Sequence, residues 1–128
     1  MKHKTYKIES WCNDYPGDRP PRFLQPFLLV FLKQEPTHGY QLIEKLASLG
    51  VKHENYEIGY IYKTLRTMEK NGFVSSKWDT KARGAARRIY QITEEGENQL
   101  KRWITSIKQI RKSLKSLLDM CQDVCDKT

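Results

Sequence analysis

Residues 59–74 read GYIYKTLRTMEKNGFV, and they carry the clearest structural pattern in the chain. Ile61, Leu65 and Met68 recur at the spacing of one helix face, which predicts an amphipathic helix over about 58–70. Asn71-Gly72 follows directly and predicts the end of that helix. The opposite face is free to contact another molecule and carries Tyr60, Lys63, Thr64 and Thr67.

Two helices are predicted before this one. The first covers 22–33, with Pro26 in its first turn, where a missing N–H does least harm. Its predicted apolar face consists of Phe23, Phe27, Val30 and Phe31. The second begins at Thr37, a residue type favoured at helix N-caps, and ends before Gly50. Its predicted apolar face consists of Tyr40, Leu42, Ile43, Leu46 and Leu49.

A two-stranded β-ribbon is predicted after the third helix. Residues 73–78 alternate loosely between apolar and polar side chains, and residues 88–92 alternate more regularly, which is typical of strands. The linking residues 79–86 are too many for a tight hairpin turn and form a basic tip. The predicted fold is therefore mainly α with a small β-wing. This winged helix-turn-helix places a helix in the major groove of DNA.

A long helix is predicted for the C-terminal part. Thr93 is a favourable N-cap, and Glu94 and Glu95 suit the positive end of the helix dipole. Apolar side chains then repeat at two heptad positions, which predicts pairing with a second subunit. They are Leu100, Ile107, Leu114 and Cys121 at one position, and Trp103, Ile110, Leu117 and Val124 at the other. The expected division is an N-terminal arm (1–21), a winged helix-turn-helix domain (22–93) and a C-terminal dimerisation helix (94–128).

The composition narrows the choice of partners. The 128 residues carry a formal net charge of +8 and a pI near 9.4, which favours polyanions such as DNA, RNA or an anionic membrane surface. The longest apolar run, residues 27–32, is far shorter than the roughly 20 residues that span a bilayer. No apolar signal-peptide core follows the basic N-terminus, so a cytoplasmic location is expected. Three cysteines, an odd number, argue against a disulfide framework.

In order and spacing, several short motifs resemble the PadR family of bacterial transcriptional regulators. They are His38-Gly39-Tyr40, Gly59-Tyr60-Ile61-Tyr62, the 65–72 stretch before Phe73-Val74, Trp78, and residues 87–96, RRIYQITEEG. The resemblance spans about residues 27–117. It implies a homodimer that binds double-stranded DNA at an inverted-repeat operator, usually as a repressor.

The expected DNA contacts come from the third helix, the start of the second helix and the wing. Lys63 can donate to guanine or phosphate, while Thr64 and Thr67 can meet a thymine methyl group. His38 lies at a helix start, where it can cap the helix or contact phosphate. Small residues beside Arg83 would let the wing tip approach phosphates or a narrow minor groove. The predicted set is His38, Tyr40, Tyr60, Tyr62, Lys63, Thr64 and Thr67, with Lys77, Lys81, Arg83, Arg87 and Arg88 of the wing.

The predicted function is that of a dimeric, sequence-specific regulator of transcription that could respond to an effector. No combination of nucleophile, base and orienting group is recognisable in the sequence, so we expect neither an enzyme nor a cofactor. Two other classes remain open. One is a winged-helix module for protein–protein contacts, and the other is a module that binds RNA or an anionic surface.

Candidate effector residues are Trp11, Tyr15, Trp103, Cys121 and Cys125. Trp103 is either a core or dimer-seam residue or an aromatic wall for a planar ligand between subunits. Cys121 and Cys125 are four residues apart, so their thiols point the same way from a helix. They are small apolar residues that end the heptad pattern, an oxidation-sensitive pair, or ligands of a soft metal with Cys12 as a third.

Overall fold

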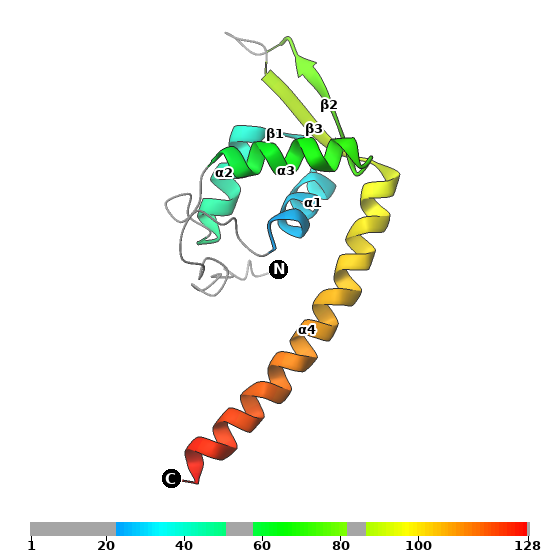
Figure 1. The fold of residues 1–128 in the computed structure, drawn as a ribbon. Helices are drawn as coiled ribbons and strands as arrows, with labels where there is room; N and C mark the ends of the chain where they lie inside the picture. The colour runs from blue at the N-terminus through cyan, green and yellow to red at the C-terminus, as the bar shows by residue number, and fades with distance from the viewer. Residues whose placement is uncertain (1–22, 51–57, 82–86, 128) are drawn as a thin grey trace, which may run out of the picture.

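The computed structural model describes residues 23–50, 58–81 and 87–127, and the elements follow one another as the sequence predicts. The predicted arm and the wing-tip residue Arg83 lie outside the described residues. Figure 1 shows the order α1 (Leu24–Gln34), β1 (Thr37–His38), α2 (Gly39–Ser48), α3 (Gly59–Lys70), β2 (Val74–Asp79), β3 (Arg87–Ile92) and α4 (Glu94–Asp126).

The wing contains one more strand than predicted. The sheet is antiparallel in the order β1-β3-β2, with Thr37 opposite Tyr90 on one side of β3 and Trp78 opposite Arg88 on the other. β1 is only two residues long, too short to show an alternating pattern. It ties the start of α2 to the base of the wing.

The predicted N-cap of α2 was wrong by one residue. Thr37 belongs to β1 and is only 2% exposed, and its hydroxyl donates to the Glu35 carbonyl (2.8 Å). His38 is the N-cap, and its backbone N–H donates to the Gln41 side-chain oxygen (3.1 Å). Thr37 pairs with β3 and does not cap α2, so the helix begins one residue later than predicted.

The core is built mainly from α1, α2 and α3. The α3 face predicted from the sequence is confirmed, because Ile61, Leu65 and Met68 are all fully buried. The predicted face of α1 was partly wrong, since Val30 is 41% exposed and Phe27 only half-buried. α1 packs against α2, α3, β3 and α4, and so buries a different and broader face: Leu24, Leu28, Leu29, Phe31 and Leu32.

Gly72 ends α3 as predicted. Its φ of 81° lies in the left-handed region, which a residue with a Cβ rarely adopts. The Phe73 N–H donates to the Met68 carbonyl (2.9 Å) and the Gly72 N–H donates to the Glu69 carbonyl (3.0 Å). This pair of bonds is a Schellman motif, and it turns the chain directly into β2.

The start of α4 is packed onto this same turn. Thr93 is the N-cap, as predicted; its hydroxyl oxygen accepts from the Gly96 N–H (3.0 Å), and the hydroxyl donates to the Gly72 carbonyl. Gly96 is buried, and a Cβ on it would overlap the carbonyl oxygen of Phe73 and lie 2.7 Å from Ile92. Only glycine lets the first turn of α4 approach the backbone of the wing this closely.

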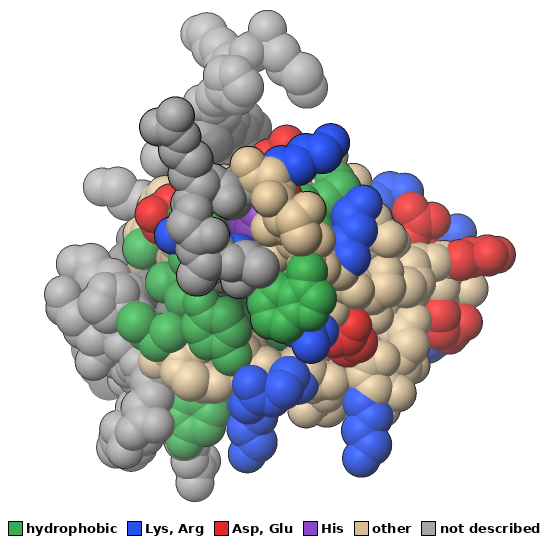
Figure 2. All heavy atoms as spheres, turned by 90° about the horizontal axis from the view of Figure 1, so that it is seen from above, with side chains coloured by type: hydrophobic (Ala, Val, Ile, Leu, Met, Phe, Trp, Pro, Cys, Tyr) green, Lys and Arg blue, Asp and Glu red, His purple; other side chains and the backbone are tan. Residues whose placement is uncertain are grey.

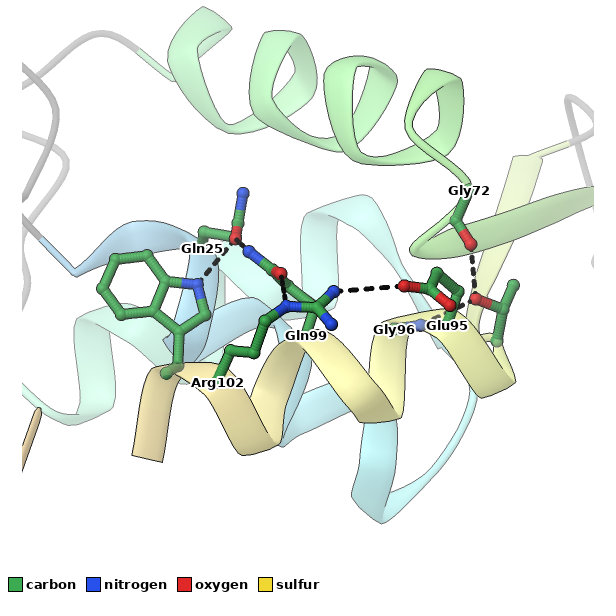
Figure 3. A network of polar contacts seen from close by, with 8 residues as sticks. Gln25, Gly72, Glu95, Gly96, Gln99 and Arg102 are labelled. Atoms are coloured by element: carbon green, nitrogen blue, oxygen red, sulfur yellow. Dashed lines mark hydrogen bonds and ion pairs between the residues drawn. The ribbon is translucent and has the colours of Figure 1, made fainter. Parts of the chain in front are cut away.

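A polar network holds the next two turns of α4 against α1 (Figure 3). The Gln25 side-chain oxygen accepts from the Trp103 indole N–H (2.6 Å) and from the Gln99 amide (3.0 Å). The Phe23 ring meets the Trp103 ring edge to face at 6.3 Å. These contacts set the direction in which α4 leaves the domain.

The C-terminal part of α4 extends away from the rest of the domain (Figure 1). With 33 residues, the helix is about 50 Å long at about 1.5 Å per residue. Between Ile107 and Val124 its apolar stripe is largely exposed. None of the helices in the described ranges is both long and apolar enough to cross a membrane.

We predict that Gly96→Ala destabilises the protein by about 1–3 kcal/mol, the usual cost of forcing an extra methyl group into a packed site. The overlap is with backbone, which cannot move aside as a flexible side chain can. Denaturant unfolding followed by circular dichroism measures the effect. Gly59→Ala is the control. Nothing lies within 4 Å of its added Cβ, so the stability of this variant is expected to change little. Equal midpoints for Gly96→Ala and the wild type would contradict the packing argument.

Candidate nucleic-acid interface

A hollow of about 1050 Å³ lies between α3, the wing and the start of α2. Four aromatic side chains and four arginine or histidine side chains line it, together with Gly39 and a single carboxylate, Glu69. Seen from above the domain in Figure 2, Lys and Arg side chains stand beside a group of hydrophobic side chains. The lining residues are His38, Gly39, Tyr40, Tyr62, Arg66, Glu69, Trp78, Arg87, Arg88 and Tyr90.

The predicted contact residues on α3 differ in how far they are exposed. Lys63 and Thr67 are exposed, whereas Tyr60 is half-buried and packs against the core. The hydroxyls of Thr64 and Thr67 donate to the carbonyls one turn earlier, at Tyr60 (2.6 Å) and Lys63 (3.0 Å). The threonines are therefore better suited to methyl contacts than to hydrogen bonds with a ligand.

Arg66 is a candidate contact that the sequence reasoning missed. It is exposed and lines the hollow, on the side of α3 that faces the wing. It follows Tyr62 by four residues, so both side chains lie on one helix face. This four-residue spacing is the feature of the sequence that could have identified Arg66 as a contact residue. Trp78 was also missed as a contact residue, although it lines the hollow and is 57% exposed.

The position of Tyr62 depends on Gly39. A Cβ on Gly39 would lie 2.6 Å from the edge of the Tyr62 ring, so the ring occupies the space that any other residue would need. Gly39 is buried at the first position of α2. This close approach joins α2 to α3 and places the Tyr62 ring in the wall of the hollow.

His38 links α2 to the wing. Its Nε2 lies 2.9 Å from the Asp79 carboxylate at the end of β2, and its ring stacks on Tyr40 at 5.6 Å. The Arg87 guanidinium lies over the other ring of this stack, 4.8 Å from the centre of Tyr40. The backbone N–H of Lys81 bonds the Asp79 carboxylate (3.1 Å), and this bond, followed by the His38 contact, lowers the pKa of Asp79.

Arg88 is held from several sides. Its guanidinium lies over the Trp78 ring, 4.8 Å from the ring centre, and donates to the Ser76 hydroxyl (2.8 Å). The Glu69 carboxylate is 3.9 Å from the same nitrogen. Tyr90 is buried in the same lining, and burial, followed by the charge of Glu69, raises the pKa of its hydroxyl.

The structure thus brings together only part of the predicted DNA-contact set. His38, Tyr40, Tyr62, Arg87 and Arg88 surround the hollow. Outside its lining lie Tyr60, Lys63, Thr64 and Thr67 on α3 and two exposed cations of the wing, Lys77 and Lys81.

Those predicted dimerisation and effector residues that the structure describes lie on α4, outside the lining of the hollow. Leu100 and Trp103 pack partly against the domain's own core, and the Trp103 N–H is already bonded within the chain. Cys121 and Cys125 are exposed near the end of α4. Trp11, Tyr15 and Cys12 lie outside the described residues, within which no group of three potential metal ligands is found.

A family model, that of the transcriptional regulator PadR-like family, matches residues 28–102. The chain belongs to this PadR-like family. As a member, the protein is a transcriptional regulator and not an enzyme. No curated protein matches the chain.

Solved structures of PadR-like proteins share the fold. A regulator from Eggerthella lenta is 28% identical, with a TM-score of 0.66 over 75% of this chain and 81% of that chain. One from Bacillus cereus is also 28% identical, with a TM-score of 0.64 over 75% of this chain and 91% of that chain. PadR from Bacillus subtilis, solved in complex with operator DNA, is 21% identical, with a TM-score of 0.57 over 67% of this chain and 48% of that chain.

We predict that Asp79 makes this PadR-like regulator sensitive to acid. Because folding lowers the pKa of Asp79, its contribution to stability is present above the unfolded-state pKa and is lost as pH falls through the folded-state pKa. Asp79→Asn should therefore lose less stability than the wild type on acidification from about pH 5 to about pH 3. Denaturant unfolding at several pH values tests this, and parallel stability curves for the two proteins would contradict it.

Proposed function

We propose that the protein is a homodimer that binds an inverted-repeat DNA operator and represses transcription. The observation that carries this proposal is the hollow between α3 and the wing, where cationic and aromatic side chains converge. The fold shared with Bacillus subtilis PadR, a protein solved with operator DNA, supports it. Selection of bound sequences from a random DNA pool, followed by salt-dependent gel shifts, is the direct test. An RNA-binding or protein-interaction module would enrich no duplex sequence.

In this proposal, α3 enters the major groove. Lys63 and Arg66 are exposed on it and offer donors to guanine or phosphate, while the methyl groups of Thr64 and Thr67 suit thymine. The wing contacts the neighbouring backbone through Arg87, with Lys77, Lys81 and the wing-tip Arg83. Tyr40 and Tyr62 contribute hydroxyl groups to phosphates at the edge of the hollow. Both ring nitrogens of His38 already meet partners within the chain, Asp79 (2.9 Å) and Gln41 (3.0 Å), so His38 supports this edge by stacking on Tyr40.

We predict two kinds of DNA-binding defect. Lys63→Ala should cost about 1–3 kcal/mol on the preferred operator and little on unrelated DNA, because base contacts carry specificity. Arg87→Ala should weaken all sequences and flatten the salt slope by about one unit. Lys112→Ala, an exposed lysine on α4, is the charge-matched control and should change neither property. If neither Lys63→Ala nor Arg87→Ala alters binding, the groove assignment is wrong.

The proposed dimer is built on α4. Seven large apolar side chains between Ile104 and Val124 are 40–68% exposed, an area that a monomer rarely leaves open to water. The stripe continues into an apolar hollow of about 410 Å³ between α1 and α4. A second copy would cover both, and its symmetry would match an inverted repeat. The hollow is lined by Phe23, Pro26, Phe27, Val30, Ile107, Ile110, Arg111 and Leu114.

We predict that Ile107→Asp combined with Leu114→Asp gives monomers or an unfolded chain, because two carboxylates would be buried in the dimer seam. Sedimentation at micromolar concentration measures the association. Thr105→Asp combined with Lys112→Asp places charges on the opposite face of the same helix and should leave the dimer intact. A folded monomer of the unmodified protein would refute the dimer.

We propose that an effector would act at the dimer seam, where a change in α4 packing alters the spacing of the two α3 helices. Trp103 lies at the junction of α1 and α4 and would report a planar ligand there. The exposed thiols of Cys121 and Cys125 would instead respond to an oxidant or a soft metal.

A further inference from the structure

One carboxylate stands out in the proposed DNA site. Glu69 is the only acidic residue in the lining of the hollow as the structure describes it. A negative charge there repels phosphates and weakens binding to any DNA. Its neighbours indicate a role that compensates for this cost.

Glu69 is joined to Arg88 through a serine. The Ser76 hydroxyl donates to one Glu69 oxygen (2.7 Å) and accepts from the Arg88 guanidinium (2.8 Å). The other Glu69 oxygen lies 3.9 Å from the same Arg88 nitrogen. Because the serine has a single proton and gives it to the carboxylate, its lone pairs face the arginine. The arrangement fixes the guanidinium over the Trp78 ring.

We propose that Glu69 is a specificity-determining residue that positions Arg88 and withholds it from the phosphates of DNA sequences that do not fit the groove. This inference rests on the proposed DNA-binding function. Non-specific binding depends almost entirely on cations that are free to meet phosphates. A guanidinium already paired with a carboxylate contributes less to that binding.

The pairing is weak enough to be exchanged on a matching site. The two side chains are 34% and 47% exposed, and ion pairs at such positions contribute little. Arg88 also keeps further N–H groups beyond the one that Ser76 accepts, since a guanidinium carries about five. A well-fitted operator can therefore recruit Arg88, whereas a transient encounter with other DNA cannot.

The test compares Glu69→Gln with the wild type on the selected operator and on an unrelated duplex, at several salt concentrations. The glutamine is isosteric and still accepts from Ser76, but it lacks the charge. Affinity for the unrelated duplex should rise roughly two- to five-fold, the range of a partly exposed ion pair, and the salt slope should steepen by up to about one unit. Operator affinity should rise less, so the ratio of specific to non-specific affinity should fall.

Two controls isolate the mechanism. Glu95→Gln makes the same change in net charge and removes an exposed ion pair with Arg102 (3.1 Å) outside the hollow, so it should leave the ratio unchanged. In an Arg88→Gln background, Glu69→Gln should raise the affinity for the unrelated duplex much less than it does when Arg88 is present, because only the direct repulsion of phosphate is then relieved.

Three results would overturn the proposal. One is an unchanged affinity ratio in Glu69→Gln, or a change equal to that of Glu95→Gln. Another is an effect of the same size without Arg88, since Glu69 would then act only by repelling phosphate directly. The third is a loss of operator binding alone, which would mean that Glu69 reads a base. Failure of the unmodified protein to bind any duplex would instead refute the DNA-binding function itself, and this inference with it.

Discussion

The rest of the structure depends on the contact between the first turn of α4 and the turn that ends α3. Gly96 rests on the Phe73 carbonyl, where a Cβ has no room, and Thr93 bonds both Gly72 and Gly96. The Thr93 N–H also donates to the Phe73 carbonyl (3.1 Å). The end of α3, the base of the wing and the start of α4 therefore meet at one point, and their relative directions are coupled.

The two ends of the molecule present chemically different surfaces. At one end, Arg87 and Arg88 lie over the rings of Tyr40 and Trp78, which restrains the cations before any ligand arrives. Restraint of this kind lowers the entropy lost on binding. At the other end, α4 carries an apolar stripe with few contacts to its own domain. α4 meets the wing at the Gly96 junction and α1 at the Gln25 network, so a change in α4 packing acts on the domain through both contacts.

Most of the fold could be predicted because its signals are local. The spacing of Ile61, Leu65 and Met68 predicted α3, and Gly72 and Thr93 predicted the end of α3 and the start of α4. Each signal depends on residues within one or two helical turns. The motifs shared with the PadR family extended the prediction from the fold to the function. Several short segments in a fixed order identify a family even when each segment alone is weak evidence.

The sequence by itself thus determined the helices, the wing and the family, because these follow from periodicity, capping and motif order. The tertiary structure placed Thr37 in a strand, since pairing with β3 outweighs local capping preference. It also turned α1 toward Leu28 and Leu29, because α1 is covered from several sides. The link from Glu69 through Ser76 to Arg88 joins three elements, and contacts between residues distant in the chain have no local signature.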